Sequence, residues 1–308
     1  MKHQELVVDA IALYGSQARR DADGLSDIDM VVVAADVTAL THAKAALSTH
    51  GVSCATYTWR RLQRMAFRGS LFIEHLKREA LIIRDNNNAL RSFLEDFRPR
   101  SDYLSDIDAT KRTLALTSRT SDTKASLGWA YDVLAVAVRN LGLLELANHG
   151  QYVFAYRDIL AALEADGSIT SADARSLNML RRLKALYRGG HYGQLPERSV
   201  LESMQRTVSR CFHADFDSKA TGPLALAEDM LKASTFDEDK YCRLRLAEGA
   251  VMASMCEDDL GDNTFRKFQN LIRNQNLYGL FRTDLSIDVR NEASKIVGQQ
   301  MNRHIQIK

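Results

Sequence analysis

The fold is decided by residues 8–34, which read VDAIALYGSQARRDADGLSDIDMVVVA. Residues 10–14 are a short apolar run that ends at Gly15-Ser16, and residues 28–34 are a second apolar run rich in valine. Short apolar runs bounded by turn residues are typical of buried strands. The polar stretch between the two runs predicts a short helix and a turn that returns the chain to the same sheet.

Two carboxylates, Asp27 and Asp29, stand at the beginning of the second apolar run. In an extended strand, side chains two residues apart project from the same face of the sheet. Two neighbouring carboxylates repel each other unless a cation lies between them. Carboxylate oxygens suit Mg²⁺, which usually binds through one or two carboxylates plus waters and substrate phosphates. The pair therefore predicts a Mg²⁺ or Mn²⁺ site that a nucleoside triphosphate completes.

Gly15 and Ser16 end the first strand. Glycine lets the backbone approach a phosphate closely, because it has no side chain to intervene. A helix that begins at Ser16 would present free N–H groups to an anion. The turn after the first strand is therefore the expected phosphate contact, and two-metal phosphoryl transfer is the expected reaction class.

The stretch GSQARRDADGLSDIDMVVV, residues 15–33, resembles the signature of the DNA polymerase β nucleotidyltransferase superfamily. Its beginning is similar to that of bacterial minimal nucleotidyltransferases, antiphage nucleotidyltransferases and aminoglycoside adenylyltransferases. The resemblance covers roughly residues 8–85. It implies that Asp27 and Asp29 are the catalytic metal ligands and that Gly15 and Ser16 contact the nucleotide. It also makes Arg19 a candidate for a phosphate contact or a structural contact.

The chain departs from this family pattern at the third carboxylate, which members commonly carry on a later strand. The best-matching strand here, VSCATYTW at residues 52–59, contains no acidic residue. Glu74 is the candidate for that role, and a surface or capping position is the alternative. His75 is expected to be a packing or hydrogen-bonded histidine. Three nearby aromatic residues are expected in the core: Trp59, Phe67 and Phe72.

The coarse organisation predicted is α+β, with a small mixed-sheet polymerase β-like domain followed by a large helical region. The nucleotidyltransferase domain is expected over residues 1–85, a helical bundle over 86–195 and further helices over 196–308. Amphipathic helical patterns continue almost without interruption after residue 89.

Composition describes an ordinary globular protein, with 45% hydrophobic and 26% charged residues and a net charge of +2. The four cysteines contain no CxxC pair, which favours reduced, mostly buried thiols. Glu5 and Asp9 argue against a signal peptide, and no apolar stretch approaches the roughly 20 residues that span a bilayer. The expected location is cytoplasmic, without membrane insertion.

A basic stretch at residues 181–191 contains no acidic residue. A solvated helix face is the ordinary interpretation, and contact with a polyanion is the alternative. The residues that would make this contact are Arg181, Arg182, Lys184 and Arg188.

The leading functional expectation is transfer of a nucleoside monophosphate from a triphosphate to a hydroxyl acceptor. The product would be a nucleotide or oligonucleotide, as in bacterial antiphage defence, where an effector is the partner. The alternatives are an antitoxin that nucleotidylates a protein or RNA beside its toxin, an aminoglycoside-type adenylyltransferase, and an inactive nucleotide-binding scaffold.

Overall fold

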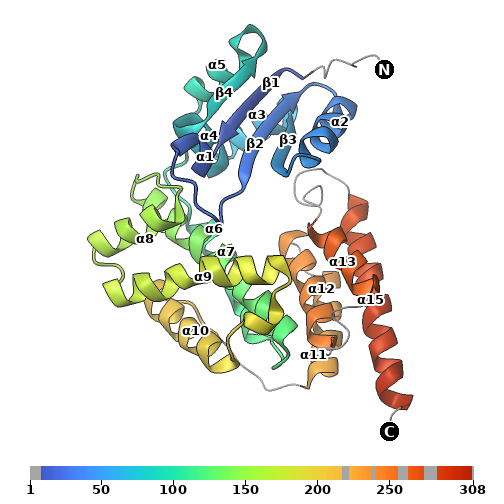
Figure 1. Ribbon diagram of the computed structural model, residues 1–308. Helices are drawn as coiled ribbons and strands as arrows, with labels where there is room; N and C mark the ends of the chain where they lie inside the picture. The colour runs from blue at the N-terminus through green and yellow to red at the C-terminus, as the bar shows by residue number, and fades with distance from the viewer. Residues whose placement is uncertain (1–7, 217–221, 237–239, 256–262, 274–282, 307–308) are drawn as a thin grey trace. The chain divides into compact units, whose positions relative to one another are not determined.

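The computed structural model describes residues 8–216, 222–236, 240–255, 263–273 and 283–306. The chain forms two compact units. Unit 1 holds the residues up to Tyr103 together with Ala147–Ala155, and unit 2 holds the other helices. The protein is α+β and mostly helical, as the sequence predicts (Figure 1).

Unit 1 is built on a four-stranded mixed sheet with the order β3-β2-β1-β4. The strands are β1 (Ala10–Tyr14), β2 (Ile28–Ala34), β3 (Val52–Thr58) and β4 (Leu81–Asp85). β1 runs antiparallel to both β2 and β4, whereas β2 and β3 are parallel. The helix α2 (Val37–Ser48) supplies the crossover that a parallel pair of strands requires.

The alternation of side chains along β2 divides the core of unit 1 into two layers. Val31 and Val33 point to the face that carries α3 (Trp59–Phe67), α4 (Leu71–Glu79) and α5 (Ala89–Asp96). Val32 and Ala34 point to the opposite face, where Leu40 and Ala43 of α2 cover them. Because both faces are covered, β2 is the continuous valine run that the sequence shows.

The helix α5 belongs to unit 1, so this unit extends past the boundary that the sequence analysis put at residue 85. Leu90 and Leu94 of α5 and Phe97 behind it are buried in the same cluster as Val31 and Val33. The hydroxyl of Tyr103 donates a hydrogen bond of 3.0 Å to the carbonyl of Gly69. This bond attaches the last residue of the first segment of unit 1 to the rest of the unit.

Two of the three aromatic residues expected in the core, Trp59 and Phe72, pack against it, but the prediction for Phe67 is wrong. Its side chain is 94% exposed. The sheet-facing stripe of α3 runs through Leu62 and Ala66, and Phe67 lies one residue off that stripe. A single-residue step turns a helical side chain by about 100°.

Unit 2 is helical throughout the residues described, and no boundary near residue 195 divides it. Its α-helices are α6 (Leu104–Ala115), α7 (Lys124–Asn148), α8 (Tyr156–Ala165), α9 (Ser171–Gly189), α10 (Arg198–Phe212), α11 (Pro223–Phe236), α12 (Lys240–Ser254), α13 (Asn263–Arg273) and α15 (Thr283–Gln306). Three short 3-10 helices complete the two units: η1 (Asn86–Asn88), η2 (Leu116–Ser118) and η3 (Tyr192–Gln194).

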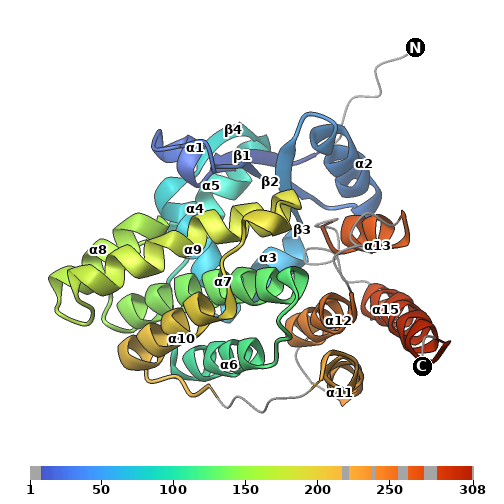
Figure 2. The same ribbon diagram turned by 60° about the horizontal axis from the view of Figure 1, so that its bottom comes forward.

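The helix α7 is the core helix of unit 2 (Figure 2). Trp129 of α7 packs on Gly249 of α12, while Gly142 of α7 lies against Ile159 of α8. α7 is long and apolar enough to cross a membrane, but 83% of its most apolar window is buried inside the protein. That burial is typical of the core helix of a soluble protein.

The cysteines among the described residues are free thiols, as expected. Cys54 and Cys242 are buried, and burial raises the pKa of the Cys54 thiol to about 11 although Lys44 opposes the shift. Cys256 lies outside the described residues. A thiol with a raised pKa is a poor nucleophile at neutral pH.

Candidate active site at the β1–β2 turn

The turn between β1 and β2 begins with a single helical turn, α1 (Ser16–Arg19). Arg20 ends it in the left-handed region at φ 65°. The carboxylate of Asp23 then accepts hydrogen bonds from the Leu25 N–H and the Ser26 hydroxyl, which shape the return to β2. α1 is too short for a large macrodipole, so any affinity of this turn for anions depends on its backbone N–H groups.

Gly15 and Asp29 lie together at the end of the sheet. Tyr14 is opposite Asp29 in the antiparallel register of β1 and β2. Gly15 has φ +72°, and a Cβ built on it would lie 3.2 Å from Asp29 Oδ2. The absence of a side chain at Gly15 therefore lets its backbone lie close to this carboxylate.

Asp27 directly precedes β2 and is exposed, whereas Asp29 is half-buried inside the strand. Alternation along β2 relates Asp29 to Val31 and Val33, which lie on the face covered by α3, α4 and α5. Asp29 therefore occupies the end of that face, beyond its apolar core, and Asp27 lies just before the strand.

No third carboxylate joins them among the residues that the structure describes, where no three His, Cys, Asp or Glu side chains are grouped to hold a metal ion. The β3 residue paired with Asp29 is Ser53. Glu74 is neither a surface residue nor part of such a group. It is only 3% exposed, and its Oε1 accepts a hydrogen bond of 2.5 Å from Arg78 Nε one helical turn later.

Arg19 makes structural contacts within unit 1. Its Nη1 lies 2.5 Å from Glu79 Oε2 and its Nε lies 3.1 Å from Asp21 Oδ2. Burial alone would lower the pKa of Arg19, but these two carboxylates outweigh it, so the pKa is raised. Arg19 therefore makes structural contacts, and its contact with a phosphate stays a prediction.

Glu79 joins Arg19 to His75, a link that the sequence analysis missed. His75 Nε2 lies 2.8 Å from Glu79 Oε2. Burial raises the pKa of Glu79, yet the hydrogen bonds and charges of His75 and Arg19 lower it more, and the net shift is downward. The spacing of four residues between His75 and Glu79 on one helix was the available signal.

His75 is the packing and hydrogen-bonded histidine that the sequence predicts. Its ring stacks on Phe154 with 4.4 Å between ring centroids and meets Tyr14 edge-on at 5.4 Å. It is only 8% exposed. These contacts place a rigid aromatic group directly behind the turn that carries Gly15.

In unit 2, one arginine of the basic stretch of α9 forms an ion pair with a buried carboxylate. Arg188 Nε lies 2.7 Å from Oδ1 of the buried Asp132. Arg182 is exposed, whereas Arg181 and Lys184 are half-buried. The Arg188 side chain is nevertheless 47% exposed. Contact of this stretch with a polyanion stays a prediction.

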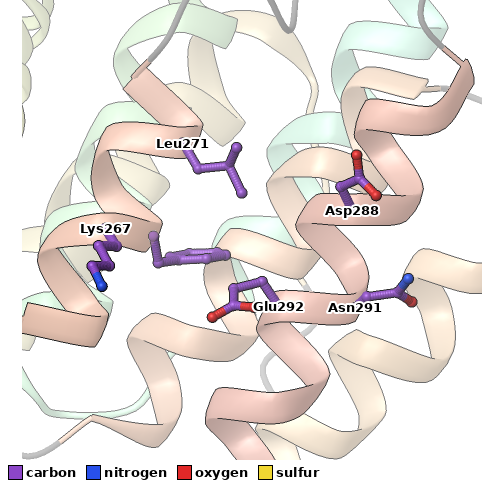
Figure 3. A pocket seen from close by; sticks show the side chains of 6 residues that line it. Lys267, Leu271, Asp288, Asn291 and Glu292 are labelled. Carbon is purple, nitrogen blue, oxygen red and sulfur yellow. The ribbon is translucent and has the colours of Figure 1, made fainter.

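A pocket of about 450 Å³ lies between α13 and α15 of unit 2 (Figure 3). Its lining mixes one cation with two carboxylates and consists of Lys267, Phe268, Leu271, Asp288, Asn291 and Glu292. None of the residues predicted from the nucleotidyltransferase resemblance contributes to it.

Comparison of this chain with protein-family models, with curated proteins and with solved structures finds no match.

Proposed function

We propose that this protein is a metal-dependent nucleotidyltransferase, which transfers a nucleoside monophosphate from a triphosphate to a hydroxyl acceptor. The observation that carries the proposal is the closeness of Gly15 to Oδ2 of Asp29, with the exposed Asp27 two residues before it in the chain. A bare backbone beside paired carboxylates is suited to a phosphate group bound through a cation.

The donor set fits Mg²⁺ or Mn²⁺. Asp27 and Asp29 offer only oxygen ligands, and Mg²⁺ commonly takes one or two carboxylates while waters and phosphates fill its other positions. A closed cage of three or more protein ligands is therefore not required. When bound, the cation would neutralise charge on the phosphates and favour the alkoxide form of the acceptor.

The chain's own residues have positioning roles in this reaction. The backbone of Gly15, which carries no side chain, would approach the triphosphate, and the backbone N–H groups that begin α1 would contact its oxygens. The acceptor oxygen forms a bond to the α-phosphorus while the bond to the pyrophosphate oxygen breaks. In this proposal the acceptor proton passes to water.

For the acceptor, we propose a nucleotide or a growing oligonucleotide, as in antiphage signalling. A protein or RNA acceptor beside a toxin is the alternative, and a small aminoglycoside is a further one. The large helical unit 2 exceeds what a small-drug pocket needs.

A nucleotide-binding module without turnover is the second candidate, and Ser53 favours it. This residue occupies the β3 position opposite Asp29, where a carboxylate would be suited to accept the acceptor proton. Such a module would bind a triphosphate with Mg²⁺ and release no pyrophosphate.

The test is incubation of the full chain with Mg²⁺ or Mn²⁺ and each labelled ribo- or deoxynucleoside triphosphate. A ladder of labelled products supports nucleotide polymerisation. Label on added RNA, on the protein or on an aminoglycoside identifies the corresponding acceptor. Binding by calorimetry without pyrophosphate release supports the module, and absence of both binding and release refutes the proposal.

A further inference from the structure

The outer face of α3 combines arginines with an exposed aromatic ring. Arg64, Phe67 and Arg68 follow Arg60 at distances of four, seven and eight residues, and Arg68 is the residue that ends the helix. Side chains at distances of four, seven and eight residues share one face of a helix. All four residues are exposed, and Phe67 is 94% exposed. We call these four residues the α3 face.

The opposite side of α3 explains why this face is turned outward. Leu62 is fully buried, and Trp59, Met65 and Ala66 pack against the same core of unit 1. The packing of this apolar stripe fixes the rotation of the helix. Phe67 is therefore exposed because the opposite side of α3 is packed against the core.

The α3 face carries three arginines and no acidic residue, and the chain contains no Asp or Glu from Val37 to Ile73. Burial is the largest cause of a lowered pKa at Arg61, and the charges of Arg64 and Arg68 add to the shift, although Tyr57 opposes it. The charges of Arg64 and Arg68 therefore reach the inner side of the same helix.

We propose that the α3 face binds single-stranded nucleic acid, with Phe67 stacking on a base and the arginines contacting phosphates. Arginine offers planar, bidentate donors that match phosphate oxygens. Base stacking on aromatic rings between basic residues is the common mode of single-strand recognition. In a duplex the faces of the bases are covered by their neighbours. A single strand can therefore stack a base on the ring of Phe67, whereas a duplex cannot.

An anionic membrane is the competing partner, and the geometry disfavours it. α3 has only nine residues, and Phe67 is the one large apolar side chain on the α3 face. Interfacial helices bury a broad apolar face in the lipid. One ring suffices for stacking but offers little area for membrane insertion.

The proposal requires neither Mg²⁺ nor a triphosphate, so it stands apart from the proposed transferase activity. Fluorescence anisotropy of the full chain would compare a labelled oligonucleotide of roughly 20 nucleotides as RNA, as DNA and as duplex. Tighter binding of a single strand than of the duplex is expected. Asp27→Asn should leave this binding unchanged while it removes transfer.

Two variants test the ring itself. Phe67→Leu keeps an apolar side chain but removes the stacking surface, and it should weaken binding roughly tenfold. Phe67→Tyr keeps the ring and should bind like the parent protein. Since Phe67 is exposed, both variants should retain the parental melting temperature.

A further set tests the charge. A triple variant, Arg60→Gln with Arg64→Gln and Arg68→Gln, should reduce the slope of log Kd against log salt concentration by about two. The loss of three phosphate contacts predicts this change. Arg91→Gln changes an exposed arginine of α5 and is the matched control. Unchanged affinity in Phe67→Leu, equal binding of duplex, or binding to anionic vesicles without binding to oligonucleotides would overturn the proposal.

Discussion

Arg19 Nη1 lies 2.5 Å from Glu79 Oε2, so the turn that follows β1 is joined to the last residue of α4. This ion pair connects residues 60 positions apart in the chain. It holds the backbone next to Gly15 against the helix that carries His75. The geometry of the candidate site therefore depends on a contact outside the site.

Removing the carboxylate from this pair should destabilise unit 1. Glu79→Gln should lower the free energy of unfolding by about 1–3 kcal/mol, because Arg19 and His75 lose a charged acceptor. Urea denaturation followed by circular dichroism measures the change. Glu95→Gln alters an exposed glutamate of α5 and should have almost no effect.

The same pair predicts a pH dependence. The pKa of Glu79 is lowered below its ordinary value of 4.5, so its stabilising contribution is complete above that pH and is lost as the pH falls through the lowered pKa. The difference in free energy of unfolding between the parent protein and Glu79→Gln should become smaller as the pH falls below 4.5. A difference that stays constant from neutral pH into acid would contradict this assignment.

Gly15 should tolerate no side chain. Gly15→Ala combines a backbone at φ 72° and ψ −152°, which is essentially restricted to glycine, with a Cβ 3.2 Å from Asp29 Oδ2, and it should weaken triphosphate binding as well as stability. Gly51→Ala is a close control, since Gly51 has the same φ of +72° but no heavy atom within 4 Å of its Cβ position. It should show the backbone cost of roughly 1–2 kcal/mol alone, with nucleotide affinity unchanged in calorimetry.

Asp27→Asn and Asp29→Asn should each reduce pyrophosphate release by at least on the order of 100-fold, because each removes a charged metal ligand. The fold should survive, since both changes relieve like-charge repulsion. Asp36→Asn, at the other end of β2, keeps a helix-capping side chain and is the matched control. Normal turnover by both site variants would refute the assignment.

A buried ionic network in unit 2 should determine the stability of that unit. Asp132 accepts hydrogen bonds of 2.7 Å from both Arg188 and Arg245, and Arg245 also pairs with Glu248. Burial alone would raise the pKa of Asp132, but the two arginines lower it more.

Asp132→Ala should therefore cost about 3–5 kcal/mol of unfolding free energy, because it leaves the buried guanidinium of Arg245 without this carboxylate. Asp122→Ala removes a carboxylate that pairs with Arg198 but is 83% exposed, and it should change stability by less than about 1 kcal/mol. Thermal unfolding of the two variants compares them directly. Equal melting temperatures would show that the network contributes no net stability.

The sequence alone determined the elements that depend on neighbouring residues. The valine run of β2, the strand that ends at Gly15 and the spacing of Asp27 and Asp29 follow from short-range periodicity, and the structure has these elements where the pattern predicts them. The absence of an acidic residue on β3 was also visible in the sequence. These features need only the strand repeat of two residues and the turn preference of glycine.

Only the tertiary structure decided what depends on distant partners. The burial of Glu74, the ion pair of Arg19 with Glu79 and the place of α5 in unit 1 arise where separate segments pack together. The prediction that Phe67 is buried was wrong because it was based on hydrophobicity alone. The rotation of α3 is fixed by the packing of Leu62 and its neighbours, and this rotation leaves Phe67 exposed. A helix has one buried face, and which residues occupy it depends on the partner that covers it.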